Sequence, residues 1–130
     1  MVDYSDDEDY YSQGFERKGV VSVWFGLNDR SNEPDADTLQ DLCGVGYYKV
    51  SDQEGNCFDF KFVDIEELLS DLSYSESFLD GVVKAAKNKK VETARWVTVQ
   101  YDFAYAPERV KRKIEEDPIF IGVFPYSDTD

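Results

Sequence analysis

Residues 94–105, ARWVTVQYDFAY, alternate between two sets of side chains, and this pattern constrains the fold more than any other in the sequence. One set is Val97, Val99, Tyr101, Phe103 and Tyr105, and the other is Trp96, Thr98, Gln100, Asp102 and Ala104. A period of two residues predicts a β-strand, because successive side chains of a strand point to opposite faces. The chain is therefore expected to contain a β-sheet with this segment as one strand.

Further strands are predicted on both sides of this segment. Residues 19–27 alternate in the same way, and residues 119–126, IFIGVFPY, are apolar on both faces. GYYKV (46–50) and CFDFKFV (57–63) flank the turn-rich stretch SDQEGN, which predicts a β-hairpin. The core-facing residues of that hairpin are expected to be Phe58, Phe60 and Phe62.

Two helices are predicted between the hairpin and the long strand. Asp64 followed by Glu67 is typical of a capping box, and Ser75 is expected to cap the second helix. The apolar faces have helical spacing: Ile65, Leu68, Leu69 and Leu72 in the first, and Phe78, Leu79, Val82, Val83 and Ala86 in the second. Shorter helices are expected over 35–43, with Leu39 and Leu42 inward, and over 107–115, with Val110 and Ile114 inward.

The order of these elements predicts the fold class. Because strands and helices do not alternate regularly, we expect a single α+β domain over residues 19–130, with a mainly antiparallel sheet of about five strands and helices packed on it. A length of 130 residues suits one domain. Residues 1–18, which include DYSDDEDYY, show no periodicity and are expected to form an acidic mobile arm. Removing residues 1–16 is expected to leave the fold intact, because the pattern places no core position there.

The residue types exclude most catalytic and metal-binding arrangements. The chain has no histidine, and Cys43 and Cys57 do not make a zinc site; we expect both thiols to be reduced and at least one to be buried. A calcium loop at Asp52 is excluded, because Gly55 stands fourth and not sixth. No glycine motif indicates a nucleotide, so no cofactor or small-molecule substrate is expected, although a hydrolase with two carboxylates stays open. No secretory signal or membrane span is found, which favours a cytoplasmic protein.

Charge is distributed unevenly along the chain, whose formal net charge is −14. Residues 1–83 hold 20 acids and 5 bases, a balance of −15, and residues 84–130 hold 8 acids and 9 bases, a balance of +1. Such acidity disfavours nucleic acid and anionic membrane as partners, and the basic run RVKRK (109–113) is interpreted as a solvated helix face. The asymmetry favours a basic protein partner as much as it favours simple solubility.

Three stretches together resemble a known family: VVSVWFG (20–26), LLSDLSYSESF (68–78) and VQYDFAY (99–105), completed by FIGVFPY (120–126). In this order and spacing they are similar to the immunity protein 22 family of bacterial polymorphic-toxin systems. The resemblance implies a non-enzymatic inhibitor that binds and blocks a cognate toxin domain. It assigns no binding role to the shared aromatic and glycine positions, which strand packing explains: Trp24, Gly26, Tyr101, Tyr105, Gly122 and Tyr126.

The acidic face expected to bind such a toxin, perhaps a nuclease, lies on the predicted hairpin and helix pair. Its candidate residues are Asp52, Glu54, Asp59, Glu66, Glu67, Asp71, Tyr74, Glu76 and Asp80. Each is equally explained as ordinary solvated surface. The alternative function is a phosphate mimic that occupies a host DNA-binding protein. Trp24 and Trp96 are expected to be buried under the helix pair or the arm; if exposed, they would form a second interface.

Overall fold

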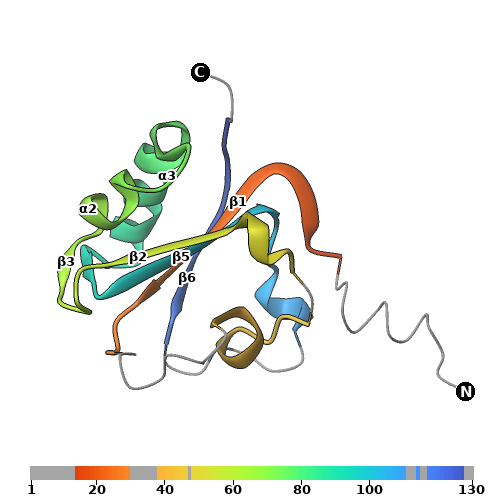
Figure 1. Cartoon of the computed structure of the whole chain (residues 1–130), viewed down its shortest axis with the longest axis horizontal. Helices are drawn as coiled ribbons and strands as arrows, with labels where there is room; N and C mark the ends of the chain where they lie inside the picture. The colour runs from red at the N-terminus through yellow and green to blue at the C-terminus, as the bar shows by residue number, and fades with distance from the viewer. Residues whose placement is uncertain (1–13, 30–37, 47, 111–113, 115–116, 128–130) are drawn as a thin grey trace, which may run out of the picture.

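The computed structural model describes residues 14–29, 38–46, 48–110, 114 and 117–127 (Figure 1). Its elements are β1 (Glu16–Gly26), η1 (Thr38–Leu42), η2 (Val50–Asp52), β2 (Gln53–Cys57), β3 (Val63–Asp64), α2 (Ile65–Ser70), α3 (Ser75–Asn88), β4 (Thr93–Ala94), β5 (Trp96–Phe103), η3 (Pro107–Arg109) and β6 (Ile119–Pro125). The four strands of the main sheet lie in the order β2-β5-β1-β6, and β3 pairs with β4. All of the pairings are antiparallel, which confirms the predicted α+β class.

The predicted central strands are confirmed as the middle of this sheet. β1 and β5 pair in continuous register from Val21 opposite Tyr101 to Gly26 opposite Trp96. Both are covered on each face, since β1 is buried from Val21 to Gly26 and β5 from Trp96 to Tyr101. The last predicted strand is β6, and it pairs with the other side of β1. No helix of the described ranges is long and apolar enough to cross a membrane.

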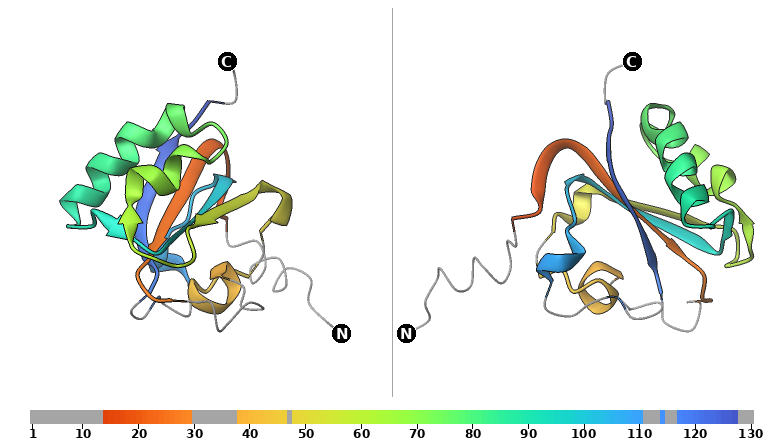
Figure 2. Two further views of the ribbon diagram at one scale, coloured as in Figure 1. Left: turned by 60° about the vertical axis from the view of Figure 1, so that its left-hand side comes forward. Right: turned by 180° about the vertical axis from the view of Figure 1, so that it is seen from behind.

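One face of the sheet is covered by α2 and α3 (Figure 2). The predicted stripe of α2 is confirmed, since Ile65, Leu68, Leu69 and Leu72 are all buried. In α3 the stripe is narrower than predicted, because Leu79 and Val83 are only partly buried. These side chains pack on the strand residues Val21, Val23, Phe25, Val97, Val99 and Tyr101. We call this cluster the helix-side core.

The opposite face of the sheet carries a second core, built from short segments that are far apart in the chain. Its buried residues are Phe15, Trp24, Leu39, Cys43, Val45, Tyr48, Phe103, Tyr105 and Val110. We call it the opposite core. Trp24 is fully buried here, so its predicted burial is confirmed, although the helix pair does not cover it. Trp96 is also buried, with its indole over Gly26, where a Cβ would clash with the ring.

The change of face inside β5 was not predicted from the sequence. Tyr101 belongs to the helix-side core, whereas Phe103 and Tyr105 belong to the opposite core. Asp102 has a φ of 56°, and the register with β1 shifts between Glu16 and Val21. Such an irregularity re-aims the side chains that follow it. The expectation that Phe103 and Tyr105 share a face with Val99 is therefore wrong.

The predicted hairpin of residues 46–50 and 57–63 is wrong. β2 is formed by the intervening residues QEGNC, and it pairs with β5 from Gln53 opposite Gln100 to Cys57 opposite Trp96. The next residues form a turn, in which Asp59 and Phe60 have φ values of 56° and 57°. A strand pairs with its neighbour through backbone groups. The long-range pairing with β5 therefore decides which residues form β2, and the local alternation of side chains in residues 57–63 does not.

The start of the fold also differs from the prediction. β1 begins at Glu16, and Phe15 is buried in the opposite core. The predicted boundary of the arm at residue 18 is therefore wrong, and removal of residues 1–16 would delete a core side chain. The rest of the predicted arm, residues 1–13, lies outside the described residues.

The N-termini of α2 and α3 are not capped by the predicted side chains. Asp64 is the N-cap of α2, as predicted, but its side chain makes no capping bond, and the Ile65 N–H donates to the Glu92 carbonyl at 3.1 Å. Ser75 is the first residue of α3 and its hydroxyl donates to the Ser70 carbonyl, so the N-cap is Tyr74 and the predicted Ser75 cap is wrong.

Residues 35–37, 111–113 and 115 of the two shorter predicted helices lie outside the described residues, and the parts that are described form single turns. Of the segment 35–43, the described part forms the turn η1, in which Leu39 is buried as predicted and Leu42 is partly buried. The helix predicted over 107–115 ends at Arg109, although Val110 is buried and Ile114 packs on the opposite core as predicted.

Candidate functional site

Three tyrosines from separate segments meet at the end of the sheet next to the α2–α3 connection. Tyr74 precedes α3, Tyr101 lies in β5, and Tyr126 follows β6. Their ring centroids lie 5.6 Å apart for Tyr74 and Tyr101, 5.7 Å for Tyr74 and Tyr126, and 5.0 Å for Tyr101 and Tyr126. Aromatic pairs at such distances contribute about 0.5–1.5 kcal/mol beyond their burial. We call this group the tyrosine cluster.

Glu54 fastens the tyrosine cluster to the edge strand β2. Its carboxylate accepts from the Ser73 N–H at 2.7 Å and the Ser73 hydroxyl at 2.6 Å. The Tyr101 hydroxyl lies 3.0 Å from the same carboxylate and also within reach of the Ser73 carbonyl. Burial, followed by the hydrogen bond and the negative charge of Glu54, raises the pKa of Tyr101 well above its usual range. Tyr101 therefore stays a neutral donor at physiological pH.

Asp102 holds the other side of the tyrosine cluster. Its Oδ1 accepts from the Tyr126 hydroxyl at 2.8 Å and from the Gly19 N–H at 2.9 Å. The Tyr126 N–H in turn donates to the Gly19 carbonyl at 3.1 Å. These bonds tie the end of β6 to the irregular part of β1, so Tyr126 is fixed from both its backbone and its hydroxyl.

Tyr74 is the member of the cluster that faces solvent. Its side chain is 47 % exposed, and its backbone is left-handed, with φ 60° and ψ 16°. A non-glycine residue in that conformation costs about 1–2 kcal/mol. The Tyr74 carbonyl accepts from the Ser77 N–H at 3.0 Å and the Ser77 hydroxyl at 2.7 Å, which holds the turn in place. The result is an exposed aromatic ring on a fixed backbone.

The nine predicted partner-binding residues do not form one continuous surface. Glu54 and Tyr74 meet in the tyrosine cluster, and the exposed Asp71 and Glu76 flank Tyr74 along the chain. Asp59 lies in the turn after β2, at the opposite end of that strand from Asp52. The exposed Glu67 lies on α2.

Glu66 and Asp80 share a shallow groove between α2 and α3 with two bases. The groove has a volume of about 260 Å³, and its other charged residues are Lys84 and Lys87. The two carboxylates there are offset by two ammonium groups. This groove is therefore less suited to a basic partner than the surroundings of Tyr74.

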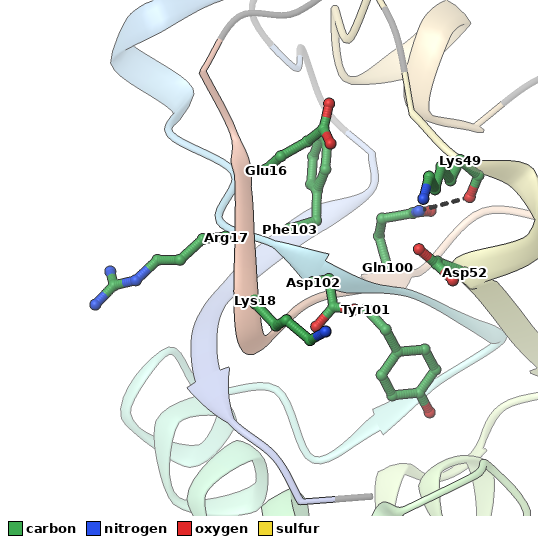
Figure 3. A pocket seen from close by; sticks show the side chains of 9 residues that line it. All are labelled: Glu16, Arg17, Lys18, Lys49, Asp52, Gln100, Tyr101, Asp102 and Phe103. Atoms are coloured by element: carbon green, nitrogen blue, oxygen red, sulfur yellow. Dashed lines mark hydrogen bonds between the residues drawn. The ribbon is translucent and has the colours of Figure 1, made fainter.

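Asp52 lines an open pocket of about 290 Å³ over β5 (Figure 3). Its rim mixes acids and bases: Glu16, Asp52 and Asp102 with Arg17, Lys18 and Lys49. The buried Gln100 donates from Nε2 to the Lys49 carbonyl at 2.8 Å. Its Oε1 and the Nε2 of Gln53 lack partners in the described structure, but the two residues are opposite each other in the ladder. The two unpartnered amide atoms belong to facing residues, so they do not by themselves indicate a ligand in this pocket.

The described residues contain no cluster of His, Cys, Asp and Glu side chains that would hold a metal ion. Cys43 is buried and Cys57 is exposed, and neither is in a disulfide, which agrees with the prediction of two reduced thiols with at least one buried. The Tyr105 hydroxyl donates a hydrogen bond to the Cys43 carbonyl at 2.6 Å, and burial raises the pKa of Tyr105. Packing in the opposite core therefore explains the positions of Cys43 and Tyr105.

No known family model, curated protein or solved structure matches this chain.

The sequence pointed to Tyr74 and Glu54 but missed the residues that position them. Tyr101 and Tyr126 were interpreted only as strand positions, and Ser73 was not singled out. One signal was available: the stretches 68–78, 99–105 and 120–126 each contribute one tyrosine to the cluster. The exposed Val50, Phe58 and Phe62 were missed because the predicted hairpin placed the two phenylalanines in the core.

Proposed function

We propose that the chain is an immunity-type inhibitor that binds a basic toxin domain in the cytoplasm, with the exposed ring of Tyr74 at the centre of the contact. The observation that carries the proposal is this ring, which is 47 % exposed and held on a fixed turn by Tyr101, Tyr126 and Ser77. The resemblance over residues 20–126 supports the same function, because it includes the segments that build the tyrosine cluster.

A tyrosine held in this way suits a protein interface. Interface energy is concentrated in a few residues, among which tyrosine is enriched, because a rigid ring buries a large area at little cost in conformational entropy. Tyr74 is already ordered by its neighbours, so little ordering remains to be done when a partner covers it. Asp71 and Glu76 place negative charge beside it, which attracts and orients a basic partner.

The surroundings favour a specific protein partner over a phosphate mimic. A mimic needs a continuous series of free carboxylates in place of phosphates. Here Glu54 is engaged by three donors, and Glu66 and Asp80 share a groove with two lysines. A localised contact around one aromatic residue fits this distribution better, and so the toxin inhibitor is the function we favour.

The test is binding to the protein encoded by the neighbouring reading frame, measured by calorimetry. Tyr74→Ala is expected to weaken binding by about 2 kcal/mol, or roughly 30-fold, as for an interface hot spot. The double variant Asp71→Lys with Glu76→Lys should weaken binding further and slow association, and added salt should weaken binding of the wild type.

The matched control is Glu108→Lys, an exposed acid in η3. η3 lies beside the opposite core, across the sheet from α3 (Figure 2). It changes the net charge in the same direction and should leave affinity nearly unchanged. Tight binding by the folded Tyr74→Ala protein would disprove the proposed contact, and an absence of any binding by the wild type would disprove the proposed partner.

A further inference from the structure

The main sheet ends in two edge strands, β2 and β6, and they differ in how well they are protected. β6 has a register shift opposite Val23 and Trp24, a Gly122 with φ 155°, and Pro125, which has no N–H. α3 also packs against it. Bulges and prolines are the usual means of blocking an edge. β6 is therefore a poor template for another strand.

β2 has neither a bulge nor a proline in the described structure. Its five residues pair with β5 in unbroken register, and within the described part of the chain no strand lies on its other side. An antiparallel strand uses only half of its backbone groups on one neighbour, so the remaining N–H and C=O groups face outward. Of these, the Gln53 N–H already donates to the Val50 carbonyl. Five residues extend about 17 Å, which suffices for a short added strand.

The exposed apolar side chains gather around this same strand. Val50, in the turn before β2, is 72 % exposed; Phe58 and Phe62, after it, are 39 % and 51 % exposed. Tyr74, the remaining large exposed hydrophobic residue of the described chain, is joined to β2 through Tyr101 and Glu54. Apolar side chains at both ends of an open edge form a contact surface for an extended segment.

The charges around β2 indicate the chemistry of that segment. Asp52, Glu54 and Asp59 lie in or beside the strand, with Lys49 and Lys61 just outside it. α2 lies over β2, as the bond from Asn56 Nδ2 to the Leu68 carbonyl at 3.1 Å shows, and it adds exposed acids at its N-cap Asp64 and at Glu67. The remaining base nearby is Arg95, which lies over the Phe62 ring. The local balance is negative, which favours lysine or arginine in the added strand.

We propose that β2 binds an extended basic segment of the partner protein as an additional strand of the sheet, with apolar residues of that segment against Val50 at one end and Phe58 and Phe62 at the other. This inference rests on the proposed function and adds the mode of recognition. The backbone pairing would give affinity, and the side chains at the ends would fix the register.

Hydrogen exchange of the complex with the neighbouring reading frame's product tests this pairing. The outward-facing amides of residues 54–57 should exchange more slowly in the complex than in the free protein, because they would gain carbonyl partners. Cys57 offers a second readout, since it is an exposed thiol at the end of β2. Its alkylation by a maleimide should slow in the complex, while the buried Cys43 serves as the internal reference.

A pair of variants links the exchange result to affinity. Val50→Lys places a cation beside the proposed basic segment and is expected to weaken binding at least about tenfold. Asn88→Lys adds the same charge at the exposed end of α3 and should have little effect. Circular dichroism checks that both variants are folded; Val50 is exposed, so its replacement should be tolerated.

The outcomes separate this inference from the proposed function. Protection of residues 54–57 together with weaker binding of Val50→Lys supports it. A complex that forms without protecting β2 overturns the added strand and leaves the proposed function standing. Failure of the wild type to bind overturns the proposed function, and this inference with it. Protection that rises with the concentration of the protein alone would identify a second copy as the occupant and also overturn the inference.

Discussion

The two faces of the central sheet are covered in different ways. The helix-side core is made by two helices that follow each other in the chain, and their buried side chains recur at helical spacing. The opposite core is made by Phe15, a single turn at η1, and irregular segments around Tyr48 and Val110. One face is thus covered by regular elements that could be recognised locally, and the other by segments that have no periodicity of their own.

The opposite core compensates for its irregular backbone with large aromatic side chains. Tyr105 lies at its centre, with ring centroids 5.2 Å from Trp24, 4.8 Å from Phe120 and 5.5 Å from Phe15. Each such side chain buries about 150–250 Å². A few aromatic residues can therefore bury as much apolar area as a helix face. We expect the opposite core to stabilise the fold as the helix-side core does.

The largest expected effect comes from truncating one aromatic residue on each face. Phe15→Ala, in the opposite core, and Phe78→Ala, in the helix-side core, should each lower the free energy of unfolding by about 3–5 kcal/mol, because both rings are buried. Urea unfolding followed by tryptophan fluorescence and by circular dichroism measures both changes.

Phe62→Ala is the control, because this ring is half exposed and lies under Arg95, whose guanidinium carbon is 4.4 Å from the ring centroid. It should cost about 1 kcal/mol or less. Phe15→Ala could leave the midpoint of urea unfolding unchanged, or it could give two separate unfolding transitions. Either result would show that the opposite core does not unfold with the rest of the domain as one cooperative unit.

The same contrast explains how much of the fold the sequence predicted. β1, β5, β6 and the helix stripe beginning at Ile65 follow from periodicity, which is a local property. The opposite core did not follow, because Phe15 is set in a polar stretch and its burial depends on Phe103 and Tyr105, which are close in the sheet but far along the chain.

The candidate site was predicted only in part for a related reason. Tyr74 and Glu54 were selected for their residue types and their acidic neighbours. Their connection depends on the pairing of β2 with β5, which brings Glu54 opposite Val99 and hence near Tyr101. The sequence predicted a local hairpin in place of that long-range pairing, because Phe58, Phe60 and Phe62 alternate as strand residues do.

A smaller effect should appear at alkaline pH, and each face contributes one tyrosine to it. Burial raises the pKa of Tyr101 on the helix side and of Tyr105 on the opposite side above their usual value near 10. Above that pH the unfolded chain loses these protons and the folded chain keeps them. The stabilisation is therefore fully present below about pH 10 and is lost as the pH rises, by at most about 1.4 kcal/mol per pH unit for each tyrosine.

Unfolding free energies measured on both sides of about pH 10 test this slope. Tyr101→Phe and Tyr105→Phe should each reduce the loss above that pH, and the double variant should reduce it most. An equal slope in the wild type and the double variant would assign the alkaline loss to other groups.

The smallest expected effect separates the buried from the exposed part of the tyrosine cluster at neutral pH. Tyr101→Phe removes the hydroxyl that donates to Glu54 or to the Ser73 carbonyl, and it should cost about 1 kcal/mol, the net value of a typical intramolecular hydrogen bond. Tyr74→Phe keeps the ring and its packing and, at an exposed position, should change stability by less than about 0.5 kcal/mol. Thermal unfolding of the two variants beside the wild type gives both values. Because Glu54 and Ser73 tie β2 to the turn that carries Tyr74, an unchanged stability of Tyr101→Phe would mean that this hydrogen bond does not hold the turn, and that the order of Tyr74 comes from ring packing alone.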